Sequence, residues 1–419
     1  MIDELVDARA ATVALTADLT DAPARTQYHP EFSPILWHVG HVAWQEEVWL
    51  LRRVGGHAPL RPELDAVLDS FVSVKSSRGG RLPPLAELRS YAQEVRERAL
   101  ALLEGLTFRE DDPLLSGGHV VHFLANHERQ HAEIIATVRL LGELYLPVRA
   151  EPVGRVASEA FDYASLPAAR FPLGNARDPS GWDNERDEHE VEVESFALRR
   201  GVVTNREWLE WMTAGGYEDE RLWDESGRLW LSQSAAESPL HWRASRDGWV
   251  ERTLAGERPV AKDAPVAHVC FHEAKAFARF AAARLPTESE WERAAAWDDA
   301  TVRKRRFAWG DEPASPERAC LSCTHASAPA PGSFAPSPTG LFDLTGGVWE
   351  WTADRFASYP GFRPQPYVGY SQPWFDHEHR VARGGSFMTA PANARTTFRN
   401  WYEPHIRQPA LGVRLAKDL

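Results

Sequence analysis

The chain has 419 residues, of which 43% are hydrophobic, and its 60 acidic and 47 basic side chains give a formal charge of −13. This composition is typical of folded domains. The basic residues do not form a cluster along the chain, and this argues against a nucleic-acid partner. The length exceeds what one hydrophobic core usually supports, so we expect two domains.

Targeting signals are not evident. The first 24 residues lack a basic and then apolar leader, and no apolar run has the length that a bilayer requires. The three cysteines are too few for a disulfide framework. We therefore expect a cytoplasmic protein without a membrane partner.

Four long amphipathic segments dominate the first 150 residues, with Pro- and Gly-containing connections between them. Four helices joined in this way, with one long crossover, predict a helical bundle. The segments are 2–19, 33–53, 84–106 and 118–141.

The second segment carries a candidate metal ligand. His41 recurs with Trp37 and Trp44 at helical spacing, which places it on the stripe that faces the bundle interior. His38 falls on a different side of this helix, beside Gln45. We therefore expect His41 to be the inward imidazole.

The fourth segment contains His127 and His131, which lie four residues apart and so share one face of a helix. With His41 they would offer three neutral nitrogens to one metal ion and leave other positions open. The same letters satisfy H-E-x-x-H, in which Glu128 would be the general base of a zinc hydrolase. Glu128 lies about 100° away around the helix, and Glu143 is the only nearby third ligand downstream. Histidines that merely hydrogen-bond in the core are the remaining interpretation.

The chain changes character after residue 150. Short segments alternate with turn signals, and Trp, Gly and Pro become frequent, which predicts an irregular mixed domain with helices near 205–213 and 272–283. Cys320 and Cys323 form a C-x-x-C in a region rich in Pro, Ala and Ser. Without a second pair of cysteines, this favours a loop with two free thiols.

Together these motifs resemble a known family. Residues 1–150 resemble a DinB-type four-helix bundle, with W-x-x-x-H at Trp37 to His41 and H-x-x-x-H at His127 to His131. Residues 151–419 resemble the formylglycine-generating-enzyme-type domain, a C-type-lectin-like fold. The combination is similar to the sulfoxide synthases of ergothioneine biosynthesis and their ovothiol and selenoneine relatives. The predicted fold is therefore α followed by α+β, and the resemblance implies that the second domain completes the active site. The matching runs of the second domain are 284–292, 340–351, 383–387 and 412–415.

The resemblance implies an Fe(II) enzyme that uses dioxygen to join sulfur or selenium to C2 of the imidazole of hercynine. The iron ligands would be His41, His127 and His131. A tyrosine of the second domain supplies a proton or hydrogen atom in such enzymes, and Tyr367 matches its position, with Tyr370 behind it. A phenol suits this role because its O–H remains protonated at pH 7.

Hercynine carries a quaternary ammonium group, which donates no hydrogen bond and is held by aromatic faces. Candidate substrate contacts combine such faces with two amide side chains for polar substrate atoms. They are Trp374, Phe375, Trp401, Tyr402, Asn400 and Gln130.

The chain departs from the family pattern where the sulfur or selenium donor binds. Relatives that take γ-glutamylcysteine have two arginines where this chain has Lys75 and Arg78, and an acidic residue where it has Tyr402. Lysine does not offer the bidentate fork of arginine. The departures favour a selenosugar or cysteine over the charged dipeptide.

Other functions remain open at the level of sequence. The same three histidines could hold zinc in a DinB-type thiol transferase, and the second domain could be a lectin-like binding module. Formylglycine-generating activity is disfavoured, because no cysteine follows Cys323. The sequence does not distinguish a monomer from a dimer.

Overall fold

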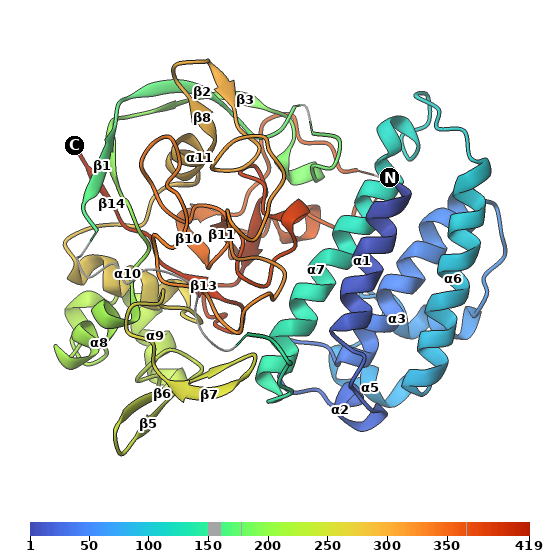
Figure 1. Ribbon diagram of the computed structural model, residues 1–419, viewed down its shortest axis with the longest axis horizontal. Helices are drawn as coiled ribbons and strands as arrows, with labels where there is room; N and C mark the ends of the chain where they lie inside the picture. Colours follow the sequence, from blue (N-terminus) through green and yellow to red (C-terminus); the bar gives the residue numbers. More distant parts are fainter. Residues whose placement is uncertain (150–160, 177, 366) are drawn as a thin grey trace. The chain divides into compact units, whose positions relative to one another are not determined.

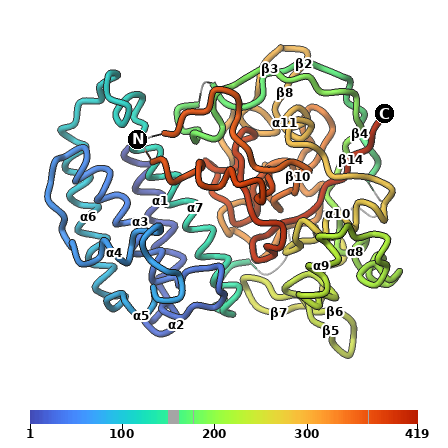
Figure 2. Tube along the Cα trace, turned by 180° about the vertical axis from the view of Figure 1, so that it is seen from behind, coloured from blue at the N-terminus to red at the C-terminus, as the bar shows by residue number. Residues whose placement is uncertain are grey.

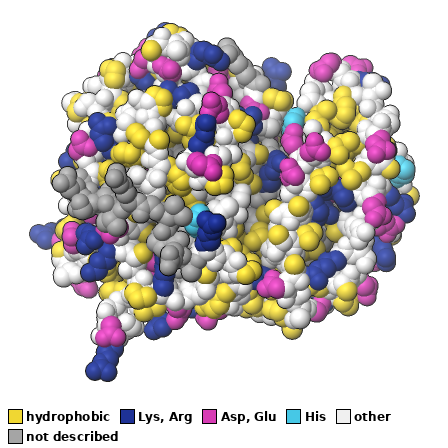
Figure 3. Space-filling model, viewed as in Figure 1, with side chains coloured by type: hydrophobic (Ala, Val, Ile, Leu, Met, Phe, Trp, Pro, Cys, Tyr) yellow, Lys and Arg dark blue, Asp and Glu magenta, His cyan; other side chains and the backbone are white. Residues whose placement is uncertain are grey.

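A computed structural model describes residues 1–149, 161–176, 178–365 and 367–419 (Figure 1). The chain divides into two compact units, Met1–Tyr145 and Leu146–Leu419. The boundary that the sequence predicts at residue 150 falls on 150–160, outside the described residues. On the face shown in Figure 3, acidic and basic side chains are interspersed. None of the described helices combines the length and hydropathy of a membrane span.

The first unit is a helical bundle, as predicted. Helix α3 packs against both α6 and α7, and α1 packs against α7 (Figure 1). Helix α3 is buried along its whole length and continues into the π-helical turn η1 (Glu47–Val54). The long helices are α1 (Ile2–Ala14), α3 (Ile35–Glu46), α6 (Leu85–Gly105) and α7 (His119–Leu141). Short helical segments connect them: α2 (Asp21–Arg25), η2 (Pro62–Leu64), α4 (Asp65–Leu68), η3 (Lys75–Ser77), α5 (Arg78–Arg81) and η4 (Ser116–Gly118).

A buried ion cluster links the four long helices. Glu46 of α3 accepts hydrogen bonds from Arg9 of α1 at 3.0 Å and from Arg96 of α6 at 2.7 Å. Glu128 of α7 accepts from the same two arginines at 2.6 and 3.1 Å. Two positive and two negative charges thus compensate one another out of water, which fixes how the helices align.

In its described residues, the second unit consists of short strands arranged in several small sheets, with helices beside them (Figure 2). The largest sheet has the order β12-β11-β10-β13, and its strands are β10 (Trp349–Arg355), β11 (Arg380–Arg383), β12 (Asn400–Tyr402) and β13 (Leu411–Gly412). A second sheet has the order β1-β4-β14 and joins the two ends of the unit, through β1 (Tyr163–Leu166), β4 (Phe196–Arg199) and β14 (Ala416–Asp418).

Smaller elements complete this unit. The helices near 205–213 and 272–283 that the sequence predicts are present as α8 (Asn205–Thr213) and α10 (Phe271–Phe280). The strands are β2 (Ala169–Leu173), β3 (His189–Val193), β5 (Trp242–Ser245), β6 (Gly248–Thr253), β7 (Gly256–Pro259), β8 (Trp297–Asp298) and β9 (Arg303–Lys304). The helices are α8 (Asn205–Thr213), α9 (Glu225–Ser234), α10 (Phe271–Phe280) and α11 (Glu288–Ala296), with the 3-10 turns η5 (Asp183–Glu185), η6 (Glu220–Leu222), η7 (Gln372–Trp374) and η8 (Pro391–Asn393).

The runs that carry the family resemblance form the core of this unit. Arg414 donates two hydrogen bonds to Glu350, at 2.6 and 2.8 Å, and both side chains are fully buried. The indole of Trp291 donates to the same carboxylate at 2.7 Å. These three residues come from three different runs, so the shared motifs of the second unit hold its irregular segments together.

Candidate metal centre

Three imidazoles meet inside the first unit. His41 comes from α3, and His127 and His131 come from successive turns of α7. One nitrogen from each ring lies within 4.8 Å of the others. The Nε2 atoms of His127 and His131 are 3.1 Å apart. The i, i+4 spacing therefore brings both rings to one point, opposite His41.

The orientation of His41 is fixed by its neighbours. Its Nδ1 lies 2.7 Å from the Leu68 carbonyl at the end of α4. A carbonyl only accepts, so Nδ1 carries the proton and the lone pair is left on Nε2. Trp37 stacks on the ring at a centroid distance of 4.2 Å, and its indole N–H donates to the Val67 carbonyl at 2.8 Å. Backbone and indole thus hold the ring with a free nitrogen for a metal.

Burial keeps these rings neutral. It lowers the pKa of His127 to about 4 and the pKa values of His41 and His131 well below the ordinary histidine value. Neutral imidazole is the form that binds metals. The donor set therefore fits a divalent transition metal held by three nitrogens on one side.

Glu128 is not placed to serve this centre. Its carboxylate is buried and accepts hydrogen bonds from Arg9 and Arg96 in the ion cluster described above. A general base needs a carboxylate that can reach a water molecule or substrate. The arrangement speaks against the zinc hydrolase interpretation of the H-E-x-x-H letters.

His38 lies closer to the cluster than the sequence predicted. We expected it on a different side of α3, but its Nδ1 is 2.8 Å from Nδ1 of His131. Positions 38 and 41 are three apart and are therefore neighbours on a helix surface. The ring of His131 reaches from α7 to the edge of the stripe that His41 occupies, and contacts His38 there.

The two cations predicted to meet the donor do not form a pair. Lys75 is exposed and bonds Glu31 at 3.1 Å. Arg78 is buried, and its guanidinium lies 4.0 Å from the Trp37 ring. It donates to the hydroxyls of Ser73 and Ser33, at 2.9 and 2.5 Å, and to two backbone carbonyls. Burial lowers its pKa to about 10.

Gln130 is the one other substrate contact that the sequence predicts in the first unit. It is partly exposed on α7 and precedes His131 in the chain.

In the second unit, part of the predicted substrate set gathers in an aromatic cluster. Tyr370 stacks on Trp182 at 3.6 Å and meets Trp401 edge-on at 5.4 Å. Trp401 in turn stacks on Phe356 at 4.3 Å, and Phe375 contacts Phe356 at 4.9 Å. Trp182 and Phe356 could not be predicted as members of this cluster, because isolated aromatic residues carry no periodic signal in the sequence.

The other predicted site residues of this unit are Asn400, Tyr402, Trp374 and Tyr367. Asn400 donates to the Tyr402 hydroxyl at 2.8 Å. Trp374 is 38% exposed and lies edge-on to His379. Tyr367 is partly exposed in the loop that leads to Tyr370, and the preceding Pro366 is outside the described residues.

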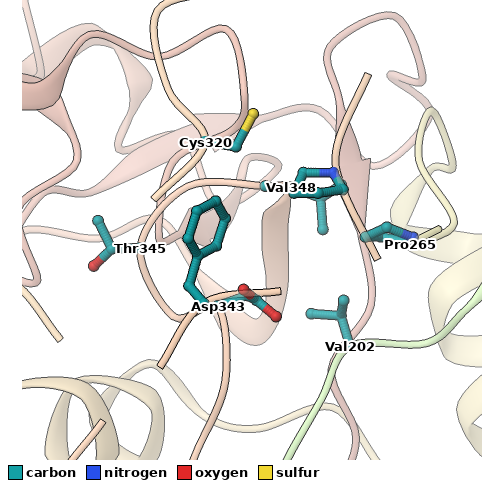
Figure 4. Close-up of a pocket in the computed structure, with 9 residues that line it drawn as sticks. Val202, Pro265, Cys320, Asp343, Thr345 and Val348 are labelled. Carbon is teal, nitrogen blue, oxygen red and sulfur yellow. The ribbon is translucent and has the colours of Figure 1, made fainter. Parts of the chain in front are cut away.

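The thiols of the second unit have no metal-site arrangement in the described part of the chain. Cys320 and Cys323 form no disulfide and are buried in a loop, as expected. Cys320 faces a small cavity, together with Asp343 and Thr345 (Figure 4). Burial raises the pKa of the Cys320 thiol to about 11, so this thiol is protonated and is a poor metal ligand.

The buried imidazoles make the metal-free protein sensitive to acid. An unfolded histidine titrates near 6.5 and folded His127 near 4, so the unfolded chain binds more protons between these values. Stability therefore falls as the pH decreases from 6.5 towards 4. We expect calorimetry to give a lower Tm at pH 5 than at pH 7, and a smaller difference for His127→Asn. An identical pH dependence in wild type and variant would contradict the neutral, buried state of this ring.

Known proteins are similar to this chain over its whole length. The model of the DinB superfamily matches residues 4–135, and that of the sulfatase-modifying factor enzyme 1-like domain matches residues 150–419. The chain is 38% identical to the hercynine oxygenase of Mycolicibacterium smegmatis, over 100% of this chain and 99% of the relative. It is 40% identical to the hercynine oxygenase of Mycolicibacterium thermoresistibile, over 99% and 94%. The formylglycine-generating enzyme of Streptomyces coelicolor is 30% identical over 60% of this chain and 88% of that enzyme.

Proposed function

Because the chain belongs to the hercynine oxygenase family, we propose that it is a nonheme iron(II) enzyme that joins sulfur or selenium to imidazole C2 of hercynine. The observation that carries this proposal is the group of three neutral imidazoles, of which His41 and His127 are buried and His131 is partly exposed. Iron bound there would supply the one-electron chemistry through which dioxygen reacts with organic substrates.

The overall reaction balances without a further reductant. The C2–H bond of hercynine and the S–H or Se–H bond of the donor break, and a C2–S or C2–Se bond forms. Dioxygen takes up four electrons. One oxygen atom leaves as water with the two hydrogens, and the other stays on sulfur or selenium.

The chain's own residues would position the metal and protect it. The Leu68 carbonyl holds the metal-binding nitrogen of His41 in place, and the indole of Trp37 covers one face of that ring. Three protein nitrogens on one side leave the other positions for substrates. Hercynine itself contains an imidazole, which is a suitable ligand for such a position.

For the donor, we propose a selenosugar or cysteine rather than γ-glutamylcysteine. Four of the five N–H groups of Arg78 already donate to protein oxygens, so this guanidinium does not present an open fork to a carboxylate. Lys75 pairs with Glu31, and Tyr402 replaces the acidic residue that the resemblance would require. An uncharged or smaller donor needs neither contact.

Mass spectrometry of the products tests the proposal. The iron-loaded protein would be incubated in air with hercynine and, in turn, a selenosugar, cysteine and γ-glutamylcysteine, with matched anaerobic samples. We expect an adduct at the imidazole with one of the first two donors, and only in air. Adducts formed without dioxygen would instead favour the DinB-type thiol transferase, and turnover with γ-glutamylcysteine alone would contradict the proposed donor.

Tyr367 is proposed to supply the proton or hydrogen atom during turnover. We expect Tyr367→Phe to bind iron normally and either to react about 100-fold more slowly, the usual contribution of a positioned acid, or to release a different product. Tyr163→Phe, in strand β1, is a matched control that should behave as wild type. Iron content, rate and product mass are the measurements. Wild-type rate and product in Tyr367→Phe would refute this role.

A further inference from the structure

The imidazole of His131 lies between two other histidines. Its Nε2 is 3.1 Å from Nε2 of His127, on the side where the three candidate ligands converge. Its Nδ1 is 2.8 Å from Nδ1 of His38. His38 is only 3% exposed, and it is not part of the group of three whose nitrogens lie within reach of one ion.

We propose that His38 is a positioning residue that orients the metal ligand His131 by accepting a hydrogen bond from its Nδ1–H. The inference rests on the proposed function, since it requires a metal at the three imidazoles. A neutral imidazole has one N–H and one lone pair. If Nε2 of His131 gives its lone pair to the metal, its proton must be on Nδ1, and the atom opposite is Nδ1 of His38.

This assignment also fixes the state of His38. An accepting Nδ1 has no proton, so neutral His38 carries its proton on Nε2. Among the described residues no partner meets hydrogen-bond geometry at this atom, although the Ser33 carbonyl interacts with the ring. Ser33 is held in turn by Arg78, which donates to its hydroxyl at 2.5 Å.

Two candidate ligands are then held in the same way. His41 donates from Nδ1 to the Leu68 carbonyl, and His131 donates from Nδ1 to the His38 ring. Both acceptors are uncharged. Acceptors of this kind set the tautomer and the ring angle of a ligand. A carboxylate in the same place would also add a negative charge beside the metal, whereas these acceptors add none.

Anaerobic titration with Co(II) tests this role without relying on turnover. His38→Leu removes the acceptor at similar size, whereas His38→Asn keeps an oxygen near the position of Nδ1. We expect His38→Leu to raise the Kd for Co(II) about 10- to 100-fold and to change its visible absorption spectrum. His38→Asn should stay within about threefold of wild type. His57→Leu, at an exposed histidine of the same unit, is the control.

The possible outcomes separate this inference from the proposed function. A wild-type Kd and spectrum in His38→Leu would overturn the inference, and so would equal losses in His38→Leu and His38→Asn, which would indicate packing alone. Failure of the wild-type protein to bind Co(II) would instead refute the metal centre itself. Circular dichroism and Tm of each variant establish that the bundle is folded.

Discussion

The double variant His127→Ala/His131→Ala is expected to lose stoichiometric iron and all turnover of hercynine while keeping its helical fold. Two of the three neutral nitrogens disappear, and the binding free energy of a metal depends on the number of its ligands. The single variant His41→Ala should have the same effect, because His41 is the one member of the group of three imidazoles that comes from α3. Iron per protein chain, measured by mass spectrometry after gel filtration, is the direct readout.

The matched control is His119→Ala. His119 lies on the same helix and stacks on Phe123, but it is outside the group of three imidazoles. This variant should retain iron at the wild-type ratio. Retention of stoichiometric iron by the double variant would show that the metal binds elsewhere, and the proposed centre would then be wrong.

A second large effect is expected in stability for Glu128→Gln. The substitution leaves Arg9 and Arg96 in the bundle interior with only the Glu46 carboxylate to compensate them. Removing one partner of a buried ion pair costs about 3 to 5 kcal/mol, so we expect a loss of about 3 kcal/mol in this four-membered cluster. Urea unfolding measures it. Iron binding should persist at a temperature where the variant is folded.

The same variant separates the two interpretations of the H-E-x-x-H letters. In a zinc hydrolase Glu128 would be the general base, and Glu128→Gln would lose activity without losing stability. Glu94→Gln is the control for the stability measurement, because Glu94 pairs with Arg98 on the exposed face of α6. It should change the free energy of unfolding by less than about 0.5 kcal/mol.

Local spacing was enough to predict the three candidate ligands. The pair in α7 follows from the period of a helix, and His41 follows from the apolar stripe on which it lies. Both helices are close to their predicted ranges. The contact of His38 with His131 could not be predicted in this way, because it depends on how α3 and α7 pack and not on the pattern within either helix.

The same limit applies to charged residues. The pattern placed Glu128 about 100° around the helix from His127, so that it need not face the ligands. It did not show that Arg9 and Arg96 meet Glu128, since these arginines come from helices distant in the chain. Arg78 looked available for a substrate, and only the folded connection shows the serine oxygens around it. In the second unit, the strands are two to seven residues long and pair across long separations, as β4 does with β14. Such pairing leaves little periodic signal, and the family resemblance supplied the fold.

X-ray absorption at the iron edge of the iron-loaded protein tests the central claim most directly. We predict scattering from three imidazole rings in the wild-type protein, an altered spectrum when hercynine is added, and no ordered iron in His127→Ala/His131→Ala. An iron spectrum without imidazole scattering, or one dominated by sulfur ligands, would contradict the account.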